Sequence, residues 1–164
     1  LDYAIGSIHF IPTQEGELID IDGSHERFAR SLKNYFHNDL DYVVETFFAQ
    51  SMAMVSRGGF DIIGHLDKVA DNASSVRPDI ERTPRFKFLI EQLIDSIADN
   101  GEITVEVNTK AFEKSGRFFP DEKWWPMLRE RHLPVVVNSD AHYTSLISAS
   151  RQEAIKRLLK ANII

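Results

Sequence analysis

Four short apolar runs rich in β-branched residues alternate along the chain with longer segments in which apolar residues recur at helical spacing. Short runs of this kind, bounded by glycine and polar residues, are typical of buried strands. They predict strands at residues 3–10, 60–65, 103–108 and 135–139. Because helical segments separate the runs, the pattern predicts an α/β fold, with parallel strands and helices outside the sheet.

Capping residues indicate where the helices begin and end. Thr83 followed by Pro84 indicates a helix start. Gly58-Gly59 ends an earlier helical segment, which a break near Asn38-Asp39 divides. Helices are therefore predicted at residues 26–57, 83–99, 121–131 and 145–161. Loops are predicted at residues 12–25, 67–78 and 109–120.

Polar side chains follow several of the predicted strands. Asp140 and His142 come after the last strand, and side chains two apart on an extended segment point the same way. His9 and His65 end two earlier strands. A single histidine in such a place is more often a core residue with a satisfied hydrogen bond. Together, at the end of a parallel sheet where sites gather, these nitrogen and oxygen donors predict a divalent metal site.

Five further residues are candidates for roles near that site. Glu106 is a carboxylate inside an apolar strand, and Asn108 points the same way. Asp67 either orients a metal ligand or caps a helix. Arg117 suits a phosphate because its guanidinium donates two parallel hydrogen bonds, and Lys68 is a weaker candidate. For each cation the alternative is an ordinary solvated surface charge.

Composition narrows the class of protein. The 164 residues suit one domain, 43% of them are hydrophobic, and the net charge is −6. No basic patch stands out, which disfavours a nucleic-acid partner, and no apolar run is long enough for a membrane span. The absence of cysteine excludes thiolate ligands and fits a reducing compartment, so a cytoplasmic location is expected.

The pattern also suggests part of a larger fold. Four βα units are about half of an eight-unit barrel. The chain begins with Leu1, close to a strand, which suggests that an N-terminal part is missing. A partial barrel leaves two open strand edges, so self-association through these edges is expected.

Four short motifs occur in a definite order: Gly-Ser-Ile-His-Phe at residues 6–10, Gly-His-Leu-Asp at 64–67, Glu-Val-Asn-Thr at 106–109 and Asn-Ser-Asp-Ala-His at 138–142. In this order they resemble the polymerase-and-histidinol-phosphatase (PHP) superfamily, and most of all its histidinol-phosphatases of histidine biosynthesis. The resemblance spans nearly the whole chain. It implies that residues 1–164 form a partial PHP domain, the C-terminal half or more of a distorted seven-stranded (β/α) TIM-like barrel.

The resemblance also implies a site for up to three divalent ions, with zinc, manganese, iron and cobalt as candidates. His9 and His65 would share one ion, Asp140 would bind a second and His142 a third. The family supplies further ligands from a His-X-His strand, an aspartate, a histidine and a bridging glutamate, all of which would precede Leu1. The site is therefore expected to be incomplete in this chain.

The expected activity is hydrolysis of a small phosphomonoester, most of all L-histidinol phosphate to L-histidinol and phosphate. The expected roles are catalysis by Asp140, His142 and Asp67, substrate binding by Arg117, Lys68 and Asn108, and support of the ligands by Glu106 and Ser7. Three alternatives remain open: a phosphodiesterase or nuclease of the same superfamily, a metal-free domain without catalytic activity, and an amidohydrolase-type barrel.

Overall fold

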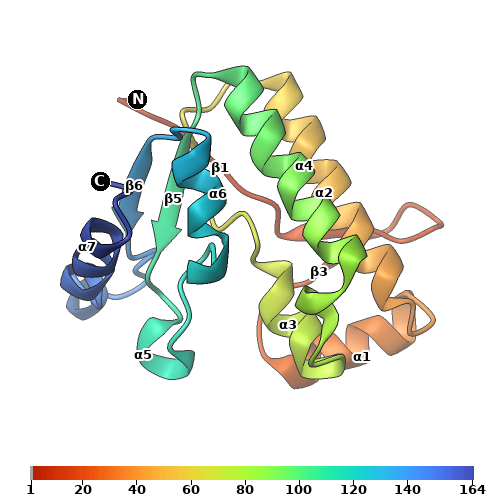
Figure 1. Ribbon diagram of the computed structural model, residues 1–164. Coiled ribbons are helices and arrows are strands. Elements are labelled where there is room, and N and C mark those ends of the chain that lie inside the picture. Colours follow the sequence, from red (N-terminus) through yellow and green to blue (C-terminus); the bar gives the residue numbers. More distant parts are fainter. Residues whose placement is uncertain (1) are drawn as a thin grey trace. The chain divides into compact units, whose positions relative to one another are not determined.

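A four-stranded parallel sheet forms the framework of the computed structural model, which describes residues 2–164. Its order is β1-β4-β5-β6, and the strands are β1 (Ile5–Gly6), β4 (Ile62–Ile63), β5 (Thr104–Asn108) and β6 (Val135–Asn138) (Figure 1). Each neighbouring pair is parallel. The predicted parallel α/β sheet is therefore confirmed, while its closure into a seven-stranded barrel stays a prediction.

The chain divides into two compact units. Among the described residues, the first contains 2–7, 58–67 and 94–164 and holds the parallel sheet. The second contains residues 8–57 and 68–93. Each unit is described below by itself.

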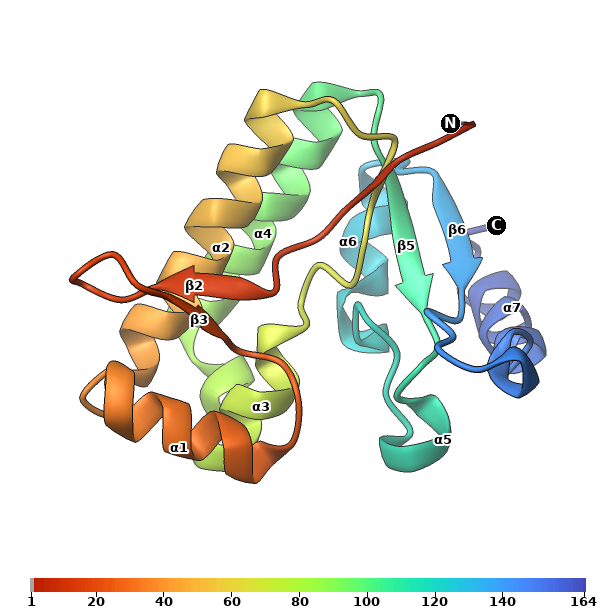
Figure 2. The same ribbon diagram turned by 180° about the vertical axis from the view of Figure 1, so that it is seen from behind.

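In the first unit, helices follow the sheet strands. They are α5 (Phe112–Ser115), α6 (Trp125–Glu130), α7 (Arg151–Lys160) and the last part of α4 (Pro84–Asn100). Helix α6 lies in front of β5 in Figure 1 and behind it in Figure 2, so it covers one face of the sheet. Val105 and Val107 on β5 are fully buried, as is Leu128 on α6. Strand alternation places Glu106 and Asn108 on the opposite face from these valines.

The second unit is mainly helical. It contains α1 (His25–Tyr35), α2 (Leu40–Arg57), α3 (Val69–Val76) and the first part of α4, together with a hairpin of β2 (Phe10–Pro12) and β3 (Leu18–Asp20) (Figure 2). Helix α2 buries apolar residues at the spacing of three and four that forms one helical face. Edge-to-face rings connect α2 to α4, with centroids 5.5 Å apart for Phe47 and Phe48 and 5.3 Å for Phe48 and Phe86.

Several expected boundaries are wrong. The strand expected at residues 3–10 divides, because only Ile5 and Gly6 pair with β4 and the chain then enters the antiparallel hairpin. His9 consequently lies between β1 and β2 and not at the end of a sheet strand. The expected loop at residues 67–78 contains α3, and the last helix begins at Arg151, beyond a short 3₁₀ turn. Among residues 2–164, no helix is both long and apolar enough to cross a membrane.

Candidate active site

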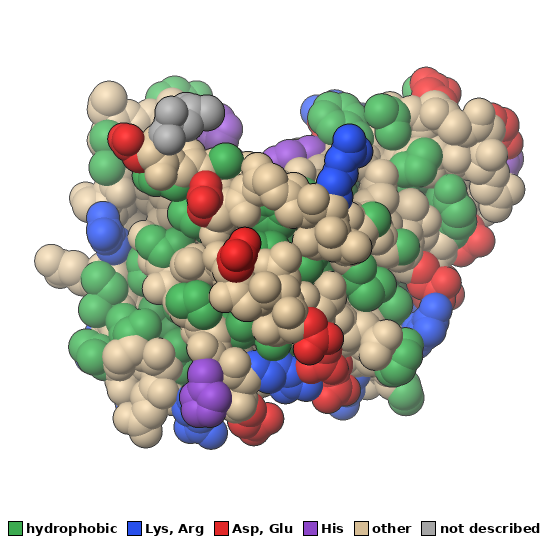
Figure 3. Space-filling view, turned by 90° about the horizontal axis from the view of Figure 1, so that it is seen from above, with side chains coloured by type: hydrophobic (Ala, Val, Ile, Leu, Met, Phe, Trp, Pro, Cys, Tyr) green, Lys and Arg blue, Asp and Glu red, His purple; other side chains and the backbone are tan. Residues whose placement is uncertain are grey.

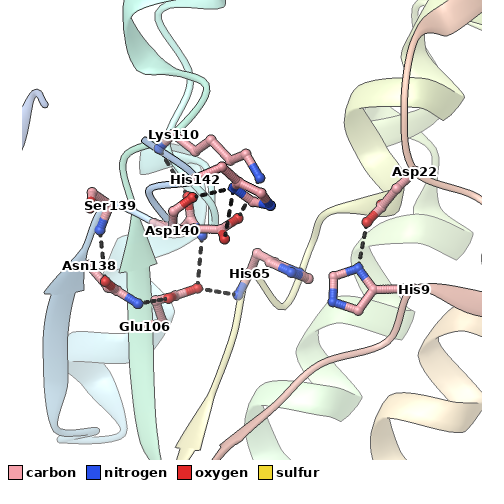
Figure 4. Close-up of polar contacts among 10 residues, drawn as sticks. His9, Asp22, His65, Glu106, Lys110, Asn138, Ser139, Asp140 and His142 are labelled. Carbon is pink, nitrogen blue, oxygen red and sulfur yellow. Dashed lines mark hydrogen bonds and ion pairs between the residues drawn. The ribbon is translucent and has the colours of Figure 1, made fainter. Parts of the chain in front are cut away.

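Glu106 is the centre of a buried polar network on the sheet (Figure 4). Its carboxylate accepts hydrogen bonds from the His65 backbone N–H at 2.9 Å, from Asn108 Nδ2 at 3.1 Å and from Asn138 Nδ2 at 2.7 Å. The Oδ1 atom of Asn138 accepts in turn from the Ser139 N–H at 2.9 Å. One carboxylate therefore ties together the turns that follow β4 and β6, where the candidate ligands lie.

This network requires a glycine beside it. A Cβ atom at Gly64 would collide with the Ser7 hydroxyl and would lie 3.3 Å from Glu106 Oε2. Without a side chain at Gly64, Ser7 and Glu106 can both approach β4. Ser7 therefore lies beside the residue that precedes His65, and its support of the ligands stays a prediction.

The backbone bends sharply at both candidate ligands of the sheet. His65 has φ = 29° and Asp140 has φ = 46°, in the left-handed region that most side chains avoid. Such a conformation costs on the order of 1–3 kcal/mol when the residue is not glycine. The hydrogen bonds that Glu106 and Asn138 make to these turns offset that cost.

Asp140 and His142 lie together in the first unit, in a turn after β6 and not on the extended segment that the prediction assumed. His142 Nδ1 is 3.9 Å from Asp140 Oδ1 and 3.0 Å from the Asp140 carbonyl oxygen. Lys110 Nζ donates to Asp140 Oδ2 at 3.0 Å (Figure 4). The His142 side chain is 64% exposed, so a small molecule can reach its imidazole.

Asp67 and Arg117 form a buried ion pair. Arg117 Nη2 lies 2.7 Å from Asp67 Oδ2, which also accepts the Asp121 backbone N–H at 3.0 Å. Asp67 is fully buried, and the guanidinium of Arg117 packs over the Phe119 ring at 5.3 Å. In this structure the pair stabilises the loop after β5. This structural role was not predicted, because the two residues are far apart in the sequence.

The other expected substrate-binding residues have structural partners. Asn108 is 1% exposed, and its Oδ1 accepts from the Lys110 backbone N–H at 3.0 Å. Both polar groups of the Asn108 amide thus bond within the protein, and its contact with a substrate stays a prediction. Lys68 belongs to the second unit, at the residue before α3.

His9 also belongs to the second unit, where its Nδ1 contacts Asp22 Oδ2 (Figure 4). Asp22 lies in the loop predicted at residues 12–25 and was not among the candidate site residues. A carboxylate on the second nitrogen of a ligating imidazole is the usual way to fix its tautomer and orientation. The contact therefore suits His9 as a ligand that binds through Nε2.

The chemistry of the donors fits a divalent ion in part. Within residues 2–164, no group of three or more His, Asp or Glu side chains is arranged to hold a metal ion. Asp140 and His142 supply one oxygen and one nitrogen donor side by side, the types that zinc, manganese, iron and cobalt accept. They therefore fit as two ligands of a site and not as a complete set.

Sequence reasoning missed two partners of this site. Asn138 anchors Glu106, and Lys110 pairs with Asp140. A signal for Asn138 was present, because asparagines end both β5 and β6 and lie in register as a pair. Lys110 carried no comparable signal.

Comparisons with known proteins give a likeness of fold. No family model matches the chain, and no curated protein matches it. Among solved structures, the chain is similar to a putative histidinol phosphatase, hisK, from Listeria monocytogenes, with a TM-score of 0.70 and 18% sequence identity. The match covers 91% of this chain and 56% of that one, so the chain spans about half the length of the protein it resembles. At this identity the likeness shows the fold alone: the chain has an α/β fold with a parallel sheet in common with that protein.

Proposed function

We propose that the chain belongs to a metal-dependent phosphomonoesterase of the PHP type, with L-histidinol phosphate as its substrate. The observation that carries the proposal is the cluster of Asp140, His142 and Lys110 at the carboxyl end of β6, anchored through Asn138 to the buried Glu106. Beyond the carboxyl ends of parallel strands is where α/β folds place their sites. The fold likeness to a protein named as a histidinol phosphatase adds support.

Asp140 and His142 would hold a divalent ion, and His9 and His65 stay predicted ligands. A bound divalent ion neutralises the charge of a phosphoryl group and makes water a better nucleophile at neutral pH.

A proton donor to the leaving alcohol could be Asp67 or His142, two of the residues expected to be catalytic, and their surroundings differ. Asp67 is fully buried and paired with Arg117, whereas the imidazole of His142 is largely exposed. A general acid must come within hydrogen-bond reach of the atom that it protonates. We therefore assign no acid role to Asp67, and His142 keeps the role of metal ligand.

Phosphate release from L-histidinol phosphate, measured on the complete enzyme with its predicted N-terminal ligands and with manganese, zinc, iron or cobalt added after chelator treatment, tests the proposal. We expect turnover that depends on the metal and that Asp140→Asn and His142→Ala abolish. His132→Gln, at an exposed histidine after α6, is the matched control and should keep full activity. Folded protein that releases no phosphate with any of these metals would contradict the proposal, as would two site variants with normal turnover.

The nuclease alternative is less well supported. On the face of the molecule in Figure 3, Lys and Arg side chains are dispersed among Asp and Glu side chains and form no continuous basic strip. Nucleic-acid substrates are held by such strips, often with aromatic side chains between the charges. Assaying a nucleotide diester beside histidinol phosphate separates the two activities, and elemental analysis of the purified protein tests the metal-free alternative.

A further inference from the structure

A pocket of about 440 Å³ opens beside Asp140 and His142 in the first unit. Its walls come from α5 and from the segment after β6, and they include Lys114, Tyr143 and Leu146. The volume is within the range of small-molecule sites, which is about 300–1,000 Å³. Because Asp140 and His142 line this pocket, a ligand inside it would touch the candidate catalytic residues directly.

Hydrogen bonds hold the walls of the pocket in place. Thr109, which is 1% exposed, donates from Oγ1 to the Ala149 carbonyl oxygen at 2.7 Å. The Ala149 N–H bonds to the Leu146 carbonyl oxygen and the Leu146 N–H bonds to the Tyr143 carbonyl oxygen, each at 3.0 Å. The segment that carries the apolar wall is therefore tied to the end of β5 as a defined turn.

The pocket has the charges that a phosphate requires. Lys114 lines it, is exposed, and forms no ion pair with any residue from 2 to 164. The second lysine of the pocket, Lys110, is bonded to Asp140. Arg117, the cation that the sequence favoured, is instead bonded to Asp67 outside this pocket. Lys114 is thus an available cation beside the candidate catalytic residues in a chain of net charge −6.

The remaining walls of the pocket carry apolar surface and one further carboxylate. Tyr143 is 72% exposed and Leu146 is 40% exposed, so both offer apolar surface on which a flat ring can lie. Glu113 adds an exposed carboxylate, which suits an ammonium group. A phosphate, a flat ring and an amine are the three features that these walls can recognise together.

We propose that this pocket binds the substrate of the proposed phosphatase, a phosphomonoester of an amino alcohol that carries a flat ring. Lys114 contacts the phosphate, Tyr143 and Leu146 cover the ring, and Glu113 contacts the amine. This assignment rests on the proposed function for the reaction, but the binding site itself can be tested without turnover.

The first experiment measures the binding of inorganic phosphate by isothermal titration calorimetry. Lys114→Met keeps the length of the side chain and removes its charge. A hydrogen bond to a charged group contributes enough that its loss should weaken phosphate binding by about tenfold. Lys114→Arg should restore most of the affinity. Lys33→Met, at an exposed lysine of α1 that lies outside the pocket, should bind like the natural protein.

The second experiment measures KM and kcat. Lys114→Met should raise the KM for histidinol phosphate by about tenfold while kcat stays within about twofold. Glu113→Gln should raise the KM for histidinol phosphate and leave the KM for p-nitrophenyl phosphate, which has no amine, unchanged. An equal rise for both substrates would overturn the role of Glu113.

The outcomes separate this inference from the proposed function. Phosphate binding that Lys114→Met weakens, in a protein that hydrolyses no phosphomonoester, would support the pocket and refute the phosphatase. Normal hydrolysis with the same KM and phosphate affinity in Lys114→Met would support the phosphatase and overturn the pocket. Equal weakening by Lys114→Met and Lys33→Met would also overturn it, because the effect would then follow net charge alone.

Discussion

Replacing Glu106 by glutamine tests whether one buried carboxylate organises the candidate site. The natural side chain accepts two hydrogen bonds at Oε2 and one at Oε1. A glutamine amide has one accepting oxygen and one donating NH₂ group. If the oxygen takes the Oε2 position, the NH₂ group faces Asn138 Nδ2, donor against donor. If the amide is reversed, the NH₂ group faces the His65 N–H and the Asn108 amide.

The magnitude follows from the better of these two arrangements. It loses one hydrogen bond to a charged group and leaves one buried donor without an acceptor, which costs about 3 kcal/mol. Removing a buried charge returns part of this, on the order of 1 kcal/mol. We therefore expect Glu106→Gln to lower the free energy of unfolding by about 2 kcal/mol, and the melting temperature by about 4–8 °C in a chain of this length.

Urea unfolding followed by circular dichroism measures this loss. Glu102→Gln is the matched control, because it makes the same chemical change at an exposed residue close to the start of β5. The control should unfold within about 0.5 kcal/mol of the natural protein. A Glu106→Gln variant as stable as the control would refute the reasoning, since three buried donors cannot lose their carboxylate without cost.

Three other variants probe separate features. Gly64→Ala should destabilise the protein by about 1–3 kcal/mol, because the new methyl group meets side chains that pack against it from β1 and β5; urea unfolding measures this, and unchanged stability would contradict the packing. Asp67→Asn should cost about 1–3 kcal/mol, because Arg117 loses the carboxylate at 2.7 Å and keeps the more distant one of Asp121 at 3.5 Å, whereas unchanged stability would show the pair to be dispensable. The hydrogen bond from Arg157 lowers the pKa of Glu153 below its ordinary value of 4.5, so this contact stabilises α7 above that pH and is lost as the pH falls through the folded-state pKa. Glu153→Gln should therefore melt below the natural protein at pH 7 and together with it in strong acid, and a difference that persists in acid would contradict the assignment.

Elements with a strong local pattern could be predicted from sequence. The strands β5 and β6 are rich in β-branched residues, and both lie within two residues of the predicted boundaries. Helix α4 begins at Pro84, and Thr83 Oγ1 accepts the Phe86 N–H at 3.2 Å, as the capping pattern indicated. Local propensity and tertiary packing agree at these places.

Helix α3 shows where local reasoning fails. The residue before it, Lys68, provides no side-chain cap, and the helix contains only eight residues. Its stability comes from contacts that are distant in sequence, since Val69, Ala70 and Ala73 are buried and Asn72 Nδ2 donates to the Ile21 carbonyl oxygen at 2.9 Å. Short helices need tertiary packing of this kind.

In the candidate site, too, some features could be predicted from local sequence and others depend on contacts between distant residues. Asp140 and His142 lie close to each other, but through a turn after β6 in which Asp140 has φ = 46° and not through the extended segment that the prediction assumed. The inward direction of Glu106 does follow from strand alternation. The pairing of Arg117 with Asp67 joins residues 50 positions apart. No local rule could identify that partner, and so the sequence favoured a phosphate role for an arginine whose side chain is used in the fold.

The path of the chain limits how this protein can be dissected. The sheet-bearing unit is assembled from three separate stretches and the helical unit from two, and α4 passes from one to the other at residues 93 and 94. No single cut in the gene isolates either unit, because every continuous piece that contains one also removes or includes strands or helices of the other. Truncated proteins would therefore lose activity because their hydrophobic cores are disrupted. Point substitutions are the better way to measure what each unit contributes to activity.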